Sequence, residues 1–192
     1  MKITSDSTLF FDASVLVAGA HSEEGGSALL LDVCEEGGSA LLLDACEEGG
    51  SALLLDACEL GGFTAQVTSL VVLEANHVLE RDFPPRSLAR FYNYLAQIDW
   101  EVLPVPPGET LQEYASQEYG SMIDRKDLHV LAAAAEGKSE FLLTLDRKHV
   151  LAAANAVAKA DLPIRILTPG DFIRQYYPLH EAYPSLPPRR NT

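Results

Sequence analysis

Residues 124–150 read DRKDLHVLAAAAEGKSEFLLTLDRKHV, and this stretch decides the fold class. Its first part predicts a helix over residues 124–136 that ends at Gly137, because alanine and leucine favour helix and glycine ends it. The second part predicts a buried strand over residues 141–145, followed directly by Asp146. Helices that alternate with buried strands are typical of parallel sheets, whose strands need helical crossover connections.

The rest of the chain continues this alternation. Strands are predicted at residues 8–12, 64–68, 100–105 and 164–168, and helices at residues 69–81, from Ser87, at 109–119 and at 148–160. We therefore expect an α/β protein with a parallel sheet and helices on both of its faces. Residues 1–175 are expected to form a single domain, and residues 176–192, which contain four prolines, a Pro-rich C-terminal tail.

The composition bounds the possible functions. Asp and Glu number 28 against 14 Lys and Arg, which gives a formal net charge of −14 and argues against nonspecific coating of nucleic acid or of an anionic membrane. No apolar run approaches the roughly 18 residues of a transmembrane helix, so no membrane contact is expected. The start MKITSDSTLF lacks the order of a signal peptide. Three cysteines are too few for a disulfide scaffold, which favours the reducing cytoplasm.

A threefold tandem repeat accounts for much of this composition. Residues 23–34, 35–46 and 47–58 read EEGGSALLLDVC, EEGGSALLLDAC and EEGGSALLLDAC, so only Val33 distinguishes the first copy. Each copy has three acids and no base, and the repeat therefore contributes −9 of the net charge together with every cysteine. The acidity and the cysteine count thus describe the repeat more than the rest of the chain.

The repeat is expected to form extra helix in one of two ways. Several short helices would begin at Ser27, Ser39 and Ser51 and be separated by the Gly-Gly pairs, and this is the favoured alternative. A single protruding helix is the other, although its apolar patch would turn by about 120° per copy. Because the copies are interchangeable and only one can fill a given place in the fold, register slippage is also expected.

Four acids occupy positions at which an ionised side chain is unusual. Asp12 and Asp146 follow predicted strands, Glu74 interrupts the apolar helix LVVLEANHVL, and Asp127 lies near the start of its helix. Carboxylates beside buried faces are normally paired or bound to a cation. The carboxyl ends of parallel strands lie at one edge of a sheet, where binding sites form. Oxygen ligands suit Mg²⁺ or Mn²⁺, and such an ion can activate water for attack on a phosphodiester.

Structural interpretations of the same residues remain open. Asp146 and Asp124 could cap the helices that follow them, and Glu74 could face solvent. Histidines also follow three of the acids, namely His77, His129 and His149, and we expect them at the surface or in support of the acids rather than as ligands of an iron or zinc site. The pairs Arg125-Lys126 and Arg147-Lys148 adjoin the proposed ligands; they could bind phosphates or simply be exposed helix starts.

Two stretches resemble a known family. FFDASVLVAGA and KDLHVLAAAAEGKSEFLLTLDRKHV, with a glutamate in an apolar helix between them, resemble the PIN-domain nucleases, which include the VapC-like toxins. The resemblance covers about residues 8–172 without the extra repeat copies. It implies a three-layer α/β/α fold with a central parallel sheet and a Mg²⁺- or Mn²⁺-dependent ribonuclease. By position, the acids that would bind metal and catalyse are Asp12, Glu74, Asp127 and Asp146, and Asp124 would join the metal ligands. Ser14 and Thr144 stand where members often have polar residues.

The resemblance also implies an RNA substrate, an antitoxin protein that blocks the site, and a homodimer. The leading hypothesis is therefore a divalent-metal-dependent endoribonuclease that serves as the toxin of a toxin–antitoxin pair. One alternative is a catalytically inactive PIN-like interaction module whose repeat mediates assembly. A metal-dependent phosphatase that does not act on nucleic acid is another, and it would be recognised by its action on small phosphate esters.

Overall fold

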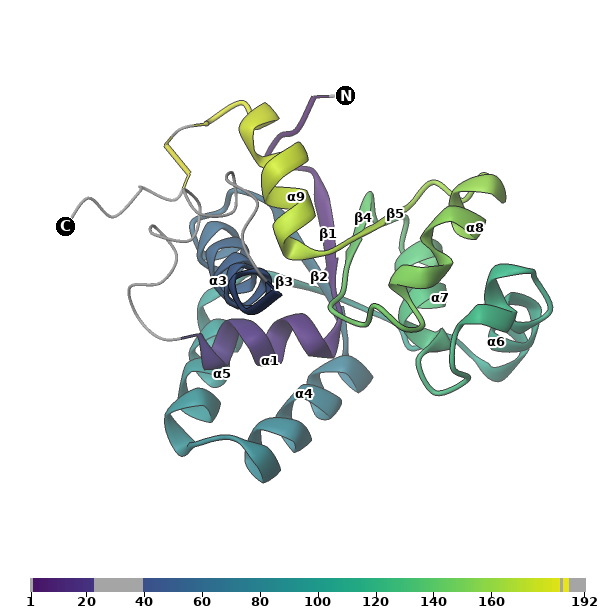
Figure 1. Cartoon of the computed structure of the whole chain (residues 1–192), viewed down its shortest axis with the longest axis horizontal. Coiled ribbons are helices and arrows are strands. Elements are labelled where there is room, and N and C mark those ends of the chain that lie inside the picture. The colour runs from purple at the N-terminus through teal and green to yellow at the C-terminus, as the bar shows by residue number, and fades with distance from the viewer. Residues whose placement is uncertain (1, 23–39, 184, 187–192) are drawn as a thin grey trace.

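A five-stranded parallel sheet lies at the centre of the molecule, in the order β3-β2-β1-β4-β5 (Figure 1). This computed structural model describes residues 2–22, 40–183 and 185–186. The strands are β1 (Thr8–Phe11), β2 (Thr64–Thr68), β3 (Trp100–Leu103), β4 (Phe141–Leu143) and β5 (Arg165–Leu167). Central β1 pairs with β2 on one side and with β4 on the other. All three residues of β4 are fully buried, as expected of an inner parallel strand.

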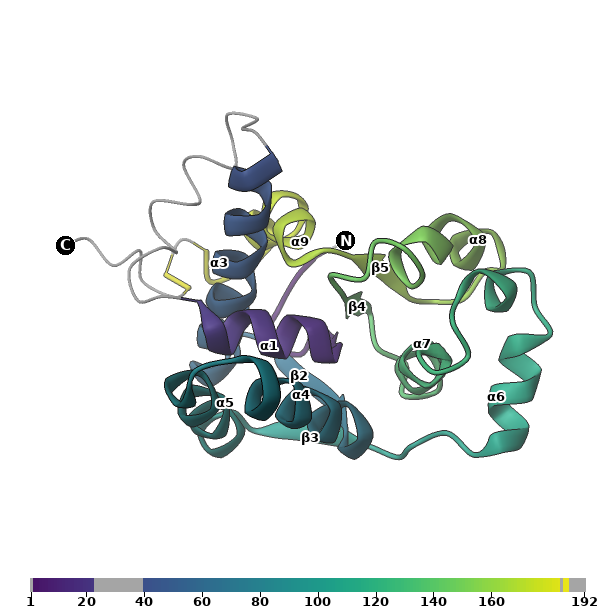
Figure 2. The same ribbon diagram turned by 60° about the horizontal axis from the view of Figure 1, so that its bottom comes forward.

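The helices lie on both sides of this sheet. Right-handed crossovers place the helices after β1 and β2 on one face and those on either side of β4 on the other, so that α1, α4 and α5 lie opposite α7 and α8 (Figures 1 and 2). The α/β fold with a parallel sheet is thus confirmed. The helices are α1 (Ala13–His21), α3 (Ala40–Glu59), α4 (Ser69–Asp82), α5 (Pro85–Gln97), α6 (Gly108–Ala115), α7 (Leu128–Glu136), α8 (Ala154–Lys159) and α9 (Pro169–Gln175), with 3-10 turns η1 (Tyr119–Met122), η2 (Leu151–Ala153) and η3 (Tyr177–Leu179).

Helix α5 begins at Pro85 and not at Ser87, and three other predicted helices also have wrong boundaries. Helix α7 begins at Leu128 and not at residue 124, because the charged segment before it forms a turn in which the Asp127 amide donates to the Asp124 carbonyl at 2.9 Å. The helix predicted at residues 109–119 ends at Ala115 and is followed by η1. Residues 148–160 form η2 and the short α8 in place of one helix. In these three cases turn hydrogen bonds replace the α-helical pattern at one end.

The described part of the repeat forms one helix. Helix α3 spans residues 40–59 without a break at Gly49-Gly50, so the prediction of a new helix beginning at Ser51 is wrong there. Packing explains the difference: a Cβ at Gly50 would lie 3.1 Å from Ile173 Cδ1 and 3.5 Å from Gly170 N, so the glycine lets α3 approach α9 closely. Burial of this helix offsets the roughly 1 kcal/mol that each interior glycine costs. The predictions for Ser27 and Ser39 lie outside the described residues.

The segment after α9 packs on the body over its described part. Tyr177 and His180 are buried, and His180 Nε2 lies 2.8 Å from the Gly62 carbonyl oxygen. Ile3 forms a parallel bridge with His180, which joins the two ends of the described chain. Within the described residues, no helix has both the length and the apolar character needed to cross a membrane.

Candidate metal centre

Asp12 lies where β1 ends, and its side chain is held in place by two hydroxyl groups. Its backbone amide donates to the Leu143 carbonyl at 3.0 Å, which fixes Asp12 beside the end of β4. Ser14 Oγ and Thr144 Oγ1 both donate to Asp12 Oδ2 at 2.7 Å. The residue is only 8% exposed. The two donated hydrogen bonds therefore orient the carboxyl group of Asp12.

Glu74 reaches the same region from α4. It lies in the second turn of the helix that follows β2, and its Oε1 is 3.2 Å from His129 Nε2 on α7. Burial raises the pKa of Glu74, and the nearby charges of Asp12 and Asp127 raise it further, while the contact with His129 opposes this shift. Glu74 therefore lies within electrostatic reach of two of the other acids, as the sequence predicts.

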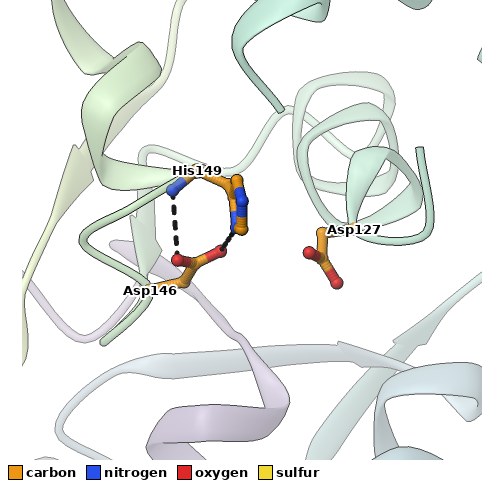
Figure 3. Close-up of side chains that lie close together, drawn as sticks. All are labelled: Asp127, Asp146 and His149. Atoms are coloured by element: carbon orange, nitrogen blue, oxygen red, sulfur yellow. Dashed lines mark hydrogen bonds and ion pairs between the residues drawn. The ribbon is translucent and has the colours of Figure 1, made fainter. Parts of the chain in front are cut away.

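Asp127, Asp146 and His149 form the most compact part of the site (Figure 3). Each offers one ligand atom, and these atoms lie within 4.8 Å of one another. Asp146 Oδ1 accepts from the amides of Lys148 (3.0 Å) and His149 (3.1 Å), and Oδ2 lies 3.2 Å from His149 Nδ1. Burial acts to raise the pKa of Asp146, but these bonds hold it below its ordinary value. Asp146 thus caps the turn after β4 and also contributes to the cluster.

The acids influence one another through their charges. Burial raises the pKa of Asp127; the adjacent Lys126 opposes this effect, while the charges of Asp146, Asp12 and Asp124 reinforce it. Carboxylates that repel one another at the carboxyl edge of a sheet can be reconciled by a bound cation. Hard divalent cations prefer carboxylate oxygens as ligands. The residues present therefore fit a divalent cation.

Asp124 lies at the margin of this group. Its side chain is exposed, and Oδ1 accepts from the Lys126 amide at 3.2 Å, which matches the capping interpretation of this residue. Its charge nevertheless reaches Asp127. A role for Asp124 as a metal ligand stays a prediction.

Two histidines lie closer to the acids of the site than the sequence indicates. His129 is buried against Glu74, and His149 belongs to the compact cluster, whereas His77 is exposed on α4. Sequence spacing places His129 two residues after Asp127 but does not show that it meets a helix more than 50 residues earlier in the chain. A buried position within an otherwise apolar helix, LHVLAAAA, is the one sequence signal that pointed to it.

The fold and this site together define an α/β protein with a cluster of acidic residues at the carboxyl edge of its sheet that could hold a metal ion. The sequence matches the PIN domain family over residues 8–148, and the chain therefore belongs to the PIN-domain family, whose members are generally metal-dependent nucleases. No curated protein and no solved structure gives a match to the chain.

Proposed function

We propose that the chain is a Mg²⁺- or Mn²⁺-dependent endoribonuclease and the toxin of a toxin–antitoxin pair. The observation that carries the proposal is the convergence of carboxylates at one edge of the sheet. Asp12 is buried and oriented by two hydroxyls, and Asp127 and Asp146 present oxygens within 4.8 Å. Membership of the PIN-domain family supports the reaction class.

The four acids share one task in this proposal, and two hydroxyl groups support them. Asp12, Glu74, Asp127 and Asp146 would hold the ion, and Thr144 and Ser14 would keep Asp12 oriented toward it. A bound divalent ion supplies an activated water and stabilises the charge that develops on the phosphodiester. The orientation of Asp12 before the ion arrives lowers the reorganisation needed during reaction.

The basic residues beside the acids support a phosphate substrate. Arg125 and Lys126 precede Asp127, Arg147 and Lys148 follow Asp146, and all four are exposed. Bases of this kind contact the sugar–phosphate backbone and position it without reading sequence. Although the chain carries a net charge of −14, the substrate would approach through the ion and these four cations.

The test is cleavage of an end-labelled RNA by the purified protein in Mg²⁺ or Mn²⁺, with and without EDTA. Metal-dependent cleavage is the expected result, and an Asp127→Asn variant should lose most of it. Retention of full activity by that variant would remove Asp127 from the site. Hydrolysis of a small phosphate ester without RNA cleavage would favour the phosphatase alternative, and the absence of any turnover would favour the interaction module.

The toxin role has its own test. Induced expression of the wild-type chain in a bacterial host should arrest growth, Asp12→Asn should not, and co-expression of a short adjacent gene product should restore growth. Arrest by the Asp12→Asn variant would contradict a toxin that acts by cleavage. The proposed homodimer predicts twice the chain mass in light scattering, and a single-chain mass would contradict it.

A further inference from the structure

The contact between His129 and Glu74 differs from the other hydrogen bonds of the site because one partner is buried much more deeply. The His129 side chain is 5% exposed, whereas that of Glu74 is 40% exposed. His129 Nδ1 is buried and has no hydrogen-bond partner among the described residues. The ring therefore interacts with the polar side of the site through Nε2 alone.

This arrangement places the shared proton on Nε2. With the only ring proton on Nδ1, the Nε2 lone pair would face the carboxylate oxygen, and the two acceptors would repel each other. With a proton on Nε2, the ring donates to Glu74 Oε1 across 3.2 Å.

We propose that His129, which donates from Nε2 to Glu74, is a positioning residue that orients the Glu74 carboxylate for the metal. The inference rests on the proposed function. Glu74 comes from a helix of its own, and its side chain contacts His129 on the opposite helix layer. The donated bond occupies Oε1 and restricts the rotation of the side chain, which would leave Oε2 to bind the ion. Residues that hydrogen-bond to a metal ligand in this way are typically worth 10- to 100-fold in metal affinity.

Two variants and two measurements test this role. In ¹⁵N-histidine NMR near neutral pH, wild-type His129 should show a protonated Nε2. In calorimetry with MnCl₂, His129→Leu should bind about 10- to 100-fold more weakly than wild type. His129→Gln places an amide donor at a similar reach, so its affinity should stay within a few-fold of wild type. Thermal unfolding of both variants confirms that they are folded.

An unprotonated Nε2, or an affinity for Mn²⁺ in His129→Leu equal to that of wild type, would overturn the proposal. The outcome is separable from the proposed function. If the wild-type protein binds no Mn²⁺ and cleaves no RNA, the proposed function fails together with the role of Glu74 as a ligand, whereas the NMR spectrum still decides the tautomer.

A second and independent observation concerns the surface on which the end of α3 packs, formed by α1, α5 and α9 and called here the α3-binding surface. The residues buried there are Ala52, Leu53, Leu54, Leu55, Ala57 and Cys58. The approach is close at Gly19, where an added Cβ would lie 2.5 Å from Leu55 Cδ1. Tyr94 on α5 donates to Asp56 Oδ1 at 2.8 Å.

Nearly the same stretch of sequence occurs twice within the described part of the chain. Residues 40–50 read ALLLDACEEGG and residues 52–62 read ALLLDACELGG, so they differ only at Glu48 and Leu60. Leu60 is 60% exposed, which means that the one differing position does not face the α3-binding surface. Gly61, with φ of 72°, and Gly62 follow the end of α3. In the sequence, Gly49-Gly50 stands at the same place in the earlier segment.

Helix geometry prevents both segments from using the surface at once. Twelve residues turn an α-helix by three turns and about a further 120°, so two copies in one helix cannot present the same face to one surface. In the exchange, residues 40–50 take the place of residues 52–62 on the α3-binding surface. The segment before the helix then becomes 12 residues shorter, and the connection before β2 becomes 12 residues longer. The entropy cost of closing a loop depends only on the logarithm of its length. The change in loop lengths therefore alters the equilibrium between the two arrangements by no more than about tenfold.

We infer that α3 has two registers 12 residues apart, in which either residues 52–62 or residues 40–50 fill the α3-binding surface. The substitution Leu55→Asp tests this, because Leu55 is fully buried and no partner for a carboxylate is expected beside Gly19. With exchange, Leu43 replaces Leu55, and the variant should unfold cooperatively with a Tm no more than about 6 °C below wild type.

Two controls complete this experiment. Leu43→Asp should leave the Tm near that of wild type, because residues 52–62 still fill the surface. The triple variant Leu31→Asp/Leu43→Asp/Leu55→Asp blocks every copy and should lose cooperative unfolding. If Leu55→Asp alone loses cooperative unfolding in the same way as the triple variant, the exchange of registers is refuted. The readout is independent of metal binding and of RNA cleavage.

Discussion

Removal of one carboxylate from the acidic cluster should stabilise the protein without metal and destabilise it with metal. The substitution is Asp127→Asn, which keeps the size of the side chain and removes its charge. Burial, reinforced by the charge of Asp146, raises the pKa of Asp127 in the folded state, so its ionised form disfavours folding at neutral pH. This penalty is present above the folded-state pKa and disappears as the pH falls toward the unfolded value of 3.8.

The magnitude follows from the distance between the acids. Asp127 and Asp146 present oxygens within 4.8 Å, where two unit charges repel by about 3 kcal/mol at an effective dielectric constant of about 20. The two side chains are 27% and 25% exposed, and solvent and salt reduce the repulsion to about 1 kcal/mol. For a chain of this size, that corresponds to a Tm about 2–4 °C higher for the variant without metal.

A divalent ion should reverse the order of stability of the wild-type protein and the Asp127→Asn variant. An ion at about 100 times its Kd stabilises the wild-type protein by about 2.7 kcal/mol, and the variant, which lacks one ligand, gains less. The assay is thermal unfolding of both proteins in EDTA and across a MgCl₂ series. Asp99→Asn, which alters an exposed acid before β3, is the control and should behave as wild type in both conditions. The reasoning would be refuted if the Tm of Asp127→Asn in EDTA were below that of wild type. It would also be refuted if Mg²⁺ raised the Tm of the variant as much as that of wild type.

Three further substitutions test other parts of the account. Thr144→Val removes the hydroxyl that donates to Asp12, so it should weaken Mn²⁺ binding about tenfold in calorimetry, whereas Thr144→Ser should not; equal affinities would contradict the role of that bond. Gly19→Val should lower the free energy of unfolding by about 1–3 kcal/mol in urea titration, since its Cβ would meet Leu55, and an unchanged midpoint would show that α1 and α3 separate easily. Tyr94→Phe loses a hydrogen bond to a carboxylate and should cost about 1.5–3 kcal/mol in the same titration; a cost near zero would mean that the bond is replaced by water.

The sheet and the acids at its edge were predictable because both depend on local patterns. Residues 141–143 are an uninterrupted apolar run, and an acid follows three residues later, which indicates an inner parallel strand whatever its neighbours are. Asp12 follows a similar run. Once the strands are known to be parallel, their carboxyl ends must meet, so the placement of both acids near one edge follows from topology.

Features that depend on contacts between distant elements were not predictable. The bond between His129 and Glu74 joins α7 to α4, and no spacing within either helix indicates it. The continuity of α3 through Gly49-Gly50 arises from its close approach to α9, a helix that the sequence pattern did not indicate at all. Intrinsic propensity favours a break at that point, and tertiary packing overrides it.

The central claim is that carboxylates at the edge of the sheet hold an ion that serves RNA cleavage, and Asp12 tests it most directly. Asp12→Asn should fold as wild type does, since the hydroxyls of Ser14 and Thr144 can still bond to the amide oxygen. The decisive measurement is the rate of Mn²⁺-dependent cleavage of one end-labelled RNA by the wild-type protein and by this variant. We predict cleavage by the wild-type protein that EDTA abolishes and a loss of at least about 100-fold in the variant. Equal rates for the two proteins, or cleavage that persists in EDTA, would contradict the account.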